Sequence, residues 1–183
     1  VYEASDRLCG GQLRMASSSP CKDILQHVPE FFKVQLERMD NVEIKLNTPV
    51  TESNVGDLNA DYVLLATGAT PLVLPIPGIE KAKIAQDVLL HKAEVSGNVV
   101  ICGGGQVGVE TALELLERGH KVSIVEMLPD LILKEELMTR IVMMKKLADA
   151  EVPVYCRHKV SRFTDGAVEI EDMQTGEKKL LAC

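Results

Sequence analysis

An α/β fold is predicted for this chain by three observations. Two short apolar runs, at 98–102 and 121–126, have the length and composition of buried strands. A glycine loop at 103–108 and a helix at 109–118 lie between them. Glu126 ends the second strand. This order predicts a Rossmann-like, three-layer nucleotide-binding domain, because such a domain has a strand, a glycine loop, a helix, a second strand and a terminal acid in succession.

The remaining elements follow from local signals. A helix is expected from Pro29 to Met39, because proline suits the first helical turn and the apolar residues after it have helical spacing. The run 61–66 predicts a buried strand, and the prolines that follow it mark a linker. We also expect a short strand at 42–46, a helix at 135–149, a strand at 153–156, and short alternating segments over 157–183 with turns at Asp165-Gly166 and Thr175-Gly176.

Two domains are predicted, a partial one with its linker at 1–96 and a second at 97–183. Truncation at both ends is expected. The first domain would lack its first strand and glycine loop, and the second would lack its last strand.

Composition indicates a globular protein and argues against several functions. Hydrophobic residues make up 46% and charged residues 26% of the chain. The net charge of -7 and the 3% of aromatic residues argue against a nucleic-acid partner. The five cysteines are scattered without ligand spacing, so no metal site and a reducing, cytoplasmic setting are expected. The sequence contains no run of about 18 apolar residues, so no membrane span is predicted.

The glycine loop carries the spacing Gly-x-Gly-x-x-Gly. Gly103 allows the tight turn, Gly105 lets the backbone approach a pyrophosphate, and Gly108 lets the helix pack closely on the strand. The pyrophosphate would meet the helix N-terminus, where free N–H groups and the helix dipole favour anions. The alternative is a crossover that binds nothing, and the complete order from strand to acid argues against it.

Glu126 predicts which nicotinamide nucleotide binds. It lies about 20 residues beyond the glycine turn, where an acid accepts hydrogen bonds from the adenosine ribose. A carboxylate there repels a 2′-phosphate, so NAD(H) is preferred over NADP(H). The alternative is that basic residues elsewhere accommodate the 2′-phosphate, so that NADP(H) also binds. Met127 is expected to fill a core gap, and Pro129-Asp130 to form a plain turn.

A weaker echo of this pattern opens the chain. Val1 and Tyr2 have the character of a strand end, Glu3 is a single acid at its tip, and the loop Gly10-Gly11 follows. The strand at 61–66 would bring the backbone of Ala66-Thr67-Gly68 close to a bound flavin nucleotide. These features predict half of a second nucleotide site, with its glycine turn outside this sequence.

On these runs the chain resembles a known group of enzymes. The segments EASDRLCGGQL, LNTPVT, LLATGATPLVLPIPGI and GGGQVGVETALELLERGHKVSIVEM are similar to the C-terminal reductase half of NADH:flavin oxidoreductases related to old yellow enzyme, such as 2-enoate, 2,4-dienoyl-CoA and bile-acid enoate reductases. The resemblance implies a glutathione-reductase-type arrangement of FAD and NAD(P) domains. It also implies an N-terminal TIM barrel holding FMN and a 4Fe-4S cluster, which this sequence does not contain.

The resemblance assigns roles to individual residues. Glu3 would hold the FAD ribose, Gln12 and Lys22 correspond to polar positions that touch the flavin nucleotide, and Val50 would meet the adenine through its backbone. The cofactor-binding positions expected on the flavin side are Glu3, Gly10, Gly11, Gln12, Lys22, Val50, Thr67, Gly68 and Ala69. Those on the nicotinamide side are Gly103, Gly104, Gly105, Gln106, Val107, Gly108, Glu110 and Glu126.

Three positions carry open alternatives. Glu110 either approaches the nicotinamide, as in related flavin reductases, or is an exposed acid that the helix dipole favours. The run RLCGGQL is one residue longer than the usual RLGGQL, which would bulge the loop or move Gln12. Cys9 in that loop is expected to be a filler, because no partner thiol lies near it in sequence. No catalytic residue is predicted.

Three functions are compatible with the sequence. In the first, NADH passes hydride to FAD and the electrons reach FMN, where an enoate or enone is reduced; the chain by itself would bind cofactors with little or no turnover. The second is a nucleotide-binding or assembly module without redox activity. The third is a stand-alone pyridine-nucleotide reductase of a flavin or a disulfide, and the disulfide version would need a CxxxxC pair that the sequence lacks.

Overall fold

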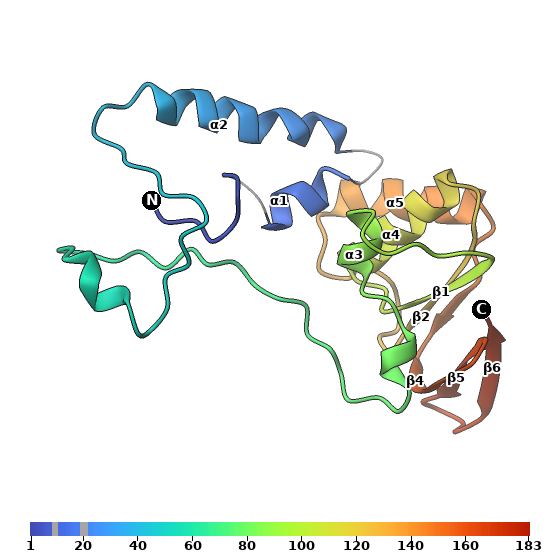
Figure 1. The fold of residues 1–183 in the computed structure, drawn as a ribbon. Coiled ribbons are helices and arrows are strands. Elements are labelled where there is room, and N and C mark those ends of the chain that lie inside the picture. The colour runs from blue at the N-terminus through green and yellow to red at the C-terminus, as the bar shows by residue number, and fades with distance from the viewer. Residues whose placement is uncertain (9–10, 19–21) are drawn as a thin grey trace. The chain divides into compact units, whose positions relative to one another are not determined.

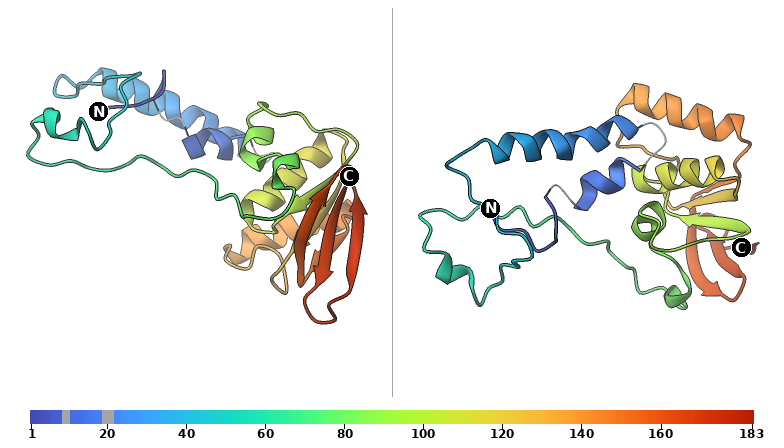
Figure 2. Two further views of the ribbon diagram at one scale, coloured as in Figure 1. Left: turned by 60° about the horizontal axis from the view of Figure 1, so that its bottom comes forward. Right: turned by 45° about the horizontal axis from the view of Figure 1, so that its top comes forward.

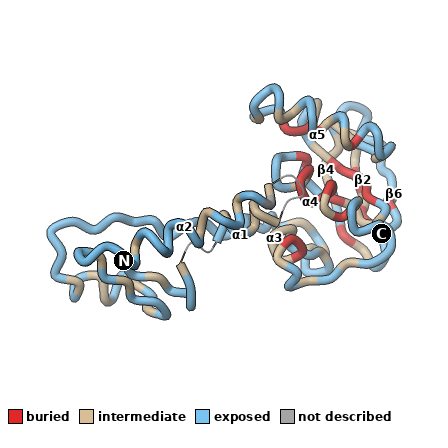
Figure 3. The backbone as a smooth tube through the Cα atoms, turned by 90° about the horizontal axis from the view of Figure 1, so that it is seen from above, coloured by how far each residue is buried: buried red, intermediate tan, exposed pale blue. Residues whose placement is uncertain are grey.

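The computed structural model describes residues 1–8, 11–18 and 22–183, and these form two compact units, 1–70 and 71–183 (Figure 1). Every buried residue among those described belongs to the second unit, as the red segments of Figure 3 show. The segment 71–96 belongs to this second unit. The predicted boundary at 96/97 between two nucleotide domains stays a prediction.

The second unit is built on a parallel sheet. Its strands are β1 (Asn98–Cys102), β2 (Lys121–Glu126) and β3 (Val154–Cys156), in the order β1-β2-β3. Helix α4 (Gln106–Glu117) connects β1 to β2, and α5 (Leu137–Asp149) connects β2 to β3. The predicted order of strand, loop, helix and strand is therefore confirmed, with element bounds close to those expected.

Both faces of the parallel sheet are covered. Successive side chains of a strand point to opposite faces, so Ile124 of β2 joins one core cluster and Val125 joins the other. Helices α3 (Ala85–Leu89), α4 and α5 pack on one face of the sheet and contribute to the first cluster together with residues of β1, β2 and the 131–132 segment. The buried members of this cluster are Val88, Ile101, Val109, Ala112, Leu113, Leu115, Val122, Ile124, Leu131, Ile132, Met143 and Leu147.

An antiparallel sheet covers the other face. Strands β4 (His158–Thr164), β5 (Ala167–Asp172) and β6 (Lys178–Ala182) pair in the order β4-β5-β6, side by side in the left view of Figure 2. The alternating segments and both turns predicted for 157–183 are confirmed. The apolar side of this sheet forms the second cluster with Val125 of β2, through Phe163, Val168, Ile170 and Leu181.

The proline-rich linker is held against β4. The N–H of Phe163 donates to the carbonyl of Pro77 at 2.9 Å, and Ile79 of the short helix η3 (Ile79–Lys81) packs against the second cluster. Lys81 forms an ion pair with Asp165 in the turn after β4. These contacts make the linker part of the second unit.

The first unit consists of short helices joined by irregular chain. Its elements are α1 (Gly11–Ala16), η1 (Asp23–Gln26), α2 (His27–Glu37) and η2 (Val55–Leu58). Helix α2 lies where a helix was expected, with Pro29 in its first turn. None of its residues is buried.

Two strands predicted in the first unit are wrong. At 42–46 the structure has a single bridge, between Lys45 and Tyr2, and 61–66 is an exposed segment without strand pairing. Tyr62, Leu64 and Leu65 expose 88%, 92% and 82% of their surface. A parallel strand needs hydrogen-bonded neighbours and covered faces, and the described residues of this unit supply neither to 61–66.

Candidate nucleotide-binding site

The glycine loop turns sharply at the end of β1. Gly103 has a φ of +114°, which a residue with a side chain rarely adopts. Its N–H donates to the carbonyl of Val125 at 2.8 Å, so the turn is fastened to the neighbouring strand β2. Gly103 therefore makes the tight turn that the sequence predicts.

Gly108 allows helix α4 to lie against β1. A Cβ atom at this position would be 1.9 Å from the carbonyl oxygen of Gly103 and 3.3 Å from Cγ2 of Ile101. Gly105 is the N-cap residue of α4 and provides no side-chain cap, and nothing lies within 4 Å of the place where its Cβ would be. The start of α4 therefore has no side-chain cap and has room beside Gly105, which suits an anion that accepts hydrogen bonds from the first-turn N–H groups.

The carboxylate of Glu126 is fixed beside this loop. Its Oε2 accepts the N–H of Gly104 at 2.6 Å, and its Oε1 accepts the N–H of Leu128 at 2.7 Å. The half-buried side chain is thus held by both the glycine loop and the chain after β2. The structure brings together the acid and the glycines that the sequence singles out.

Glu110 lies inside the second unit. Only 5% of its surface is exposed, and its Oε1 accepts a hydrogen bond from Nε2 of Gln106 at 3.1 Å. The alternative of an exposed acid at the helix start is therefore wrong, because α4 is enclosed at this point and the adjacent residues Val109 and Thr111 are buried as well. Its approach to a nicotinamide stays a prediction. Val107, on the same turn, is exposed.

On the flavin side, Glu3 belongs to a small hydrogen-bonded turn. The N–H of Ser5 donates to Oε1 of Glu3 at 2.7 Å and lowers the pKa of this carboxyl. The N–H of Thr48 donates to the Glu3 carbonyl at 2.9 Å, and this bond brings the turn before Val50 to the acid. Glu3 and the 47–50 segment are therefore neighbours.

The other positions expected on the flavin side are less enclosed. Thr67, Gly68 and Ala69 are exposed, and within the described chain no backbone hydrogen bond involves 61–70. Gly11 and Gln12, on α1, are exposed as well. Lys22 and Val50 are half-buried, while Gly10, Cys9 and Cys21 lie outside the described residues. The described residues do not form a closed flavin site.

A groove next to Glu126 was missed by the sequence analysis. It has a volume of about 280 Å³ and is lined by Met127, Pro129, Arg157, Met173 and Gln174. Met127 is 53% exposed, so its predicted role as a core filler is wrong. These residues come from three separate segments, and no motif links them in the sequence.

The described part of the chain contains neither a metal-binding cluster nor a membrane-spanning helix. Its His, Cys, Asp and Glu side chains nowhere gather in a group of three or more that would hold a metal ion. None of its helices has the length and apolar character that crossing a membrane requires.

Comparison with known proteins identifies relatives of this fold and site. The family model for pyridine nucleotide-disulphide oxidoreductases matches residues 15–183. An NADH oxidase of Thermoanaerobacter brockii is 39% identical over 152 residues, which cover 80% of this chain and 23% of that protein. A cinnamate reductase of Clostridium sporogenes is 48% identical over 91 residues, covering 50% of this chain and 14% of the relative.

A solved structure shares the fold over the full length of the chain. It is a 2-naphthoyl-CoA reductase in complex with 2-naphthoyl-CoA, with a TM-score of 0.88 and 22% identity. The match covers 100% of this chain and 27% of that one. The chain thus spans between 14% and 27% of the length of these proteins.

Proposed function

The chain belongs to the pyridine nucleotide-disulphide oxidoreductase family, and from this premise we propose that it is the electron-input part of an NADH-dependent flavin oxidoreductase. The observation that carries the proposal is the position of the Glu126 carboxylate, which the N–H groups of Gly104 and Leu128 hold beside the start of α4. An acid and a helix N-terminus in this arrangement suit the ribose and the pyrophosphate of a dinucleotide.

The residues around the loop fit such a nucleotide. The open space at Gly105 admits a pyrophosphate, and the first-turn N–H groups of α4 donate to its oxygens. Glu126 accepts from the ribose hydroxyls with lone pairs that its two backbone bonds leave free. The bound nucleotide supplies a hydride and the flavin accepts it, so the work of the chain is to position both.

NADH is the nucleotide that this site favours. A 2′-phosphate would lie next to the carboxylate of Glu126, and two negative charges at this distance repel each other. Titration of the chain with NADH and NADPH, followed by nucleotide fluorescence, tests this. We expect tighter binding of NADH, and tighter binding of NADPH would overturn the assignment.

FAD is the acceptor in this proposal. Glu3, next to the 47–50 turn, is in position to bind a ribose, and Thr67-Gly68-Ala69 has an exposed backbone for a pyrophosphate. FMN and a 4Fe-4S cluster would belong to a barrel elsewhere in the polypeptide, where an enoate or enone is reduced. The cinnamate reductase relative supports this substrate class, because cinnamate is an enoate.

A flavin absorption band in the purified chain tests the FAD assignment, and NADH-dependent reduction of cinnamate by the full-length protein tests the substrate class.

The exposed segment 61–69 favours one alternative, a nucleotide-binding module without redox activity. A colourless chain that binds NADH but does not catalyse the reduction of added FAD by NADH would support that alternative. A cytoplasmic setting is part of the proposal, consistent with the free thiols of Cys102, Cys156 and Cys183.

A further inference from the structure

We propose that Arg140 of α5 is a positioning residue for the nucleotide. Through the segment 130–132, its guanidinium sets the orientation of the peptide that joins Gly104 to Gly105, and this peptide presents the N–H of Gly105 to a phosphate oxygen. The inference rests on the proposed function, because it concerns the same nucleotide. It gives a role to a helix that lies outside the β1-α4-β2 unit.

The chain after β2 holds Gly104 from its carbonyl side. The carbonyl of Gly104 accepts the N–H of Ile132 at 2.8 Å, and a Cβ atom at Gly104 would lie 2.2 Å from Cδ2 of Leu131. The N–H of Gly104 donates to the carboxylate of Glu126 at 2.6 Å. Both backbone polar groups of this buried glycine are therefore bonded within the protein.

The carbonyl of Gly104 decides where the next N–H points. In a planar trans peptide the C=O and the N–H point in opposite directions, so a carbonyl turned toward Ile132 turns the N–H of Gly105 away from it. Gly105 is exposed, and no hydrogen bond within 1–8, 11–18 and 22–183 has its N–H as the donor. A phosphate oxygen can therefore accept this N–H.

The backbone of Ile132 is strained where it makes this contact. Its φ is +43°, in the left-handed region that β-branched residues rarely adopt, and its side chain is buried. Such a conformation persists only where the surrounding contacts hold it in place. The bond from Ile132 to Gly104 therefore needs support from outside the segment.

Arg140 supplies this support. Its Nε donates to the carbonyl of Leu131 at 3.2 Å, and its Nη2 forms an ion pair with Asp130. Oδ1 of Asp130 accepts the N–H of Leu131 at 2.8 Å. The guanidinium and the carboxylate together hold both backbone polar groups of the residue before Ile132. A planar guanidinium makes two such bonds at once, which a lysine ammonium does not reproduce.

The test measures how much the diphosphate contributes to binding. NADH is titrated into the full 183-residue chain and followed by fluorescence, and ADP and adenosine are measured as competitors. We expect Arg140→Ala to weaken NADH and ADP about tenfold, as the loss of one hydrogen bond to a charged acceptor allows. The affinity for adenosine should stay unchanged, because adenosine has a ribose but no phosphate.

A control variant and chemical rescue separate positioning from a general effect on the fold. Arg118→Ala removes an arginine that is also ion-paired and is 26% exposed, against 27% for Arg140, and it should keep the wild-type affinities. Millimolar methylguanidinium should restore NADH binding in Arg140→Ala. Methylammonium at the same concentration should not, because it lacks the planar fork.

Each outcome has one reading. If the wild-type chain does not bind NADH, the proposed function fails and this inference fails with it. If it binds NADH and Arg140→Ala keeps full affinity for NADH and ADP, only the role of Arg140 is overturned. An equal loss for ADP and adenosine would also overturn it, because Arg140 would then support the fold as a whole.

A second variant keeps the test open should Arg140→Ala not fold. Asp130→Asn retains the guanidinium and removes its charged partner, so it should weaken ADP and spare adenosine, by a smaller factor than Arg140→Ala. Full affinity for ADP in a folded Asp130→Asn chain would overturn the inference.

Discussion

At the scale of single residues, Glu126 joins two segments of the fold. Its carboxylate accepts one N–H from the glycine loop and one from the chain after β2, so the side chain proposed to bind the ribose also holds its own surroundings in place. Such bonds to an ionised acceptor are about twice as strong as neutral ones. A substitution at this position should therefore affect nucleotide binding and local order together.

We predict that Glu126→Gln weakens NADH binding about tenfold, corresponding to about 1.4 kcal/mol, and reduces the preference over NADPH. The amide has one acceptor oxygen where the carboxylate has two, and it no longer repels a phosphate. Fluorescence titration with both nucleotides measures the change. Glu117→Gln, at an exposed position on the same α4, is the control; an unchanged preference in Glu126→Gln would contradict the prediction.

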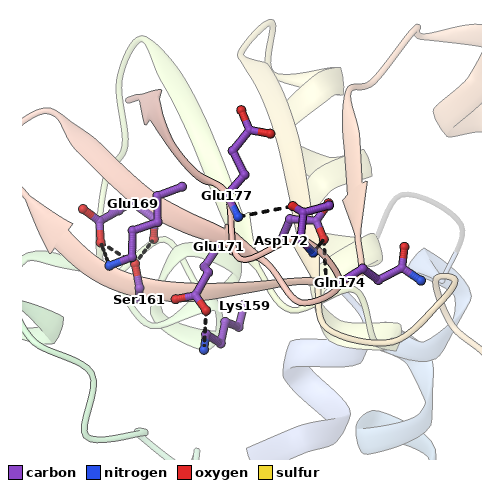
Figure 4. Close-up of polar contacts among 9 residues, drawn as sticks. Lys159, Ser161, Glu169, Glu171, Asp172, Gln174 and Glu177 are labelled. Atoms are coloured by element: carbon purple, nitrogen blue, oxygen red, sulfur yellow. Dashed lines mark hydrogen bonds and ion pairs between the residues drawn. The ribbon is translucent and has the colours of Figure 1, made fainter.

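Glu169 predicts how stability depends on pH. Its carboxylate accepts hydrogen bonds from Oγ of Ser161 at 2.6 Å, from Nζ of Lys178 at 3.1 Å and from the Arg162 guanidinium at 3.0 Å. Figure 4 shows the contact with Ser161. These donors lower the pKa of Glu169 from 4.5 to about 2. A carboxyl whose pKa is lower in the folded than in the unfolded chain stabilises the fold at pH values above its unfolded-state pKa. This stabilisation is lost as the pH falls from 4.5 toward 2.

We therefore expect Glu169→Gln to lower the urea midpoint at pH 7 and to leave it unchanged near pH 2. The measurement is urea unfolding across this pH range, followed by circular dichroism. Glu177→Gln, an exposed position close to the same sheet, should follow the wild-type curve throughout. A parallel shift of the Glu169→Gln curve at all pH values would rule out this explanation.

At the scale of elements, the packing of the βαβ segment from β1 to β2 depends on how closely α4 approaches the sheet. Gly108 sets this distance, because the carbonyl of Gly103 occupies the place where a side chain would be. The approach also places the helix N-terminus at the glycine loop, so packing and nucleotide binding share one geometry.

Gly108→Ala should displace α4 from β1, lower the free energy of unfolding by about 1–3 kcal/mol and abolish measurable NADH binding. A Cβ atom 1.9 Å from a carbonyl oxygen cannot be accommodated without backbone movement. Chemical denaturation and nucleotide titration report the two effects. Gly56→Ala, at a position with nothing within 4 Å, is the control. Full NADH affinity in Gly108→Ala would refute this prediction.

The elements also show what the sequence predicts well. The βαβ unit at 98–126 was predicted with bounds close to the observed ones, because its signals are local: apolar runs, glycine spacing and a terminal acid. The run 61–66 has the same apolar composition and is exposed. A strand forms only where a partner strand accepts its hydrogen bonds, and composition does not reveal whether that partner is present.

At the scale of the whole chain, the two units differ in how much they bury. The second unit contains both apolar clusters, whereas α2 in the first unit exposes 59% of Phe31 and 48% of Phe32. A segment with few buried contacts opens locally at little cost in free energy. The stability of the two units should therefore differ.

Limited proteolysis with chymotrypsin checks this. We expect the first cuts near Tyr62 and Leu64–Leu65 and a resistant fragment containing β1 to β6. Tyr155 and Phe163 are internal controls, because they are chymotrypsin sites within strands of the second unit. Initial cleavage at either of these two residues would contradict the prediction. Mass spectrometry of early time points identifies the cuts.

The sequence by itself determined the nucleotide fingerprint, the acid at its end and the family resemblance, because each lies in a continuous stretch whose spacing carries the chemistry. The tertiary structure alone decided three further matters. It buried Glu110, gave 61–66 no partner strand among the described residues, and brought 127–129, Arg157 and 173–174 around one groove. These depend on contacts between residues distant in sequence, which local patterns do not encode.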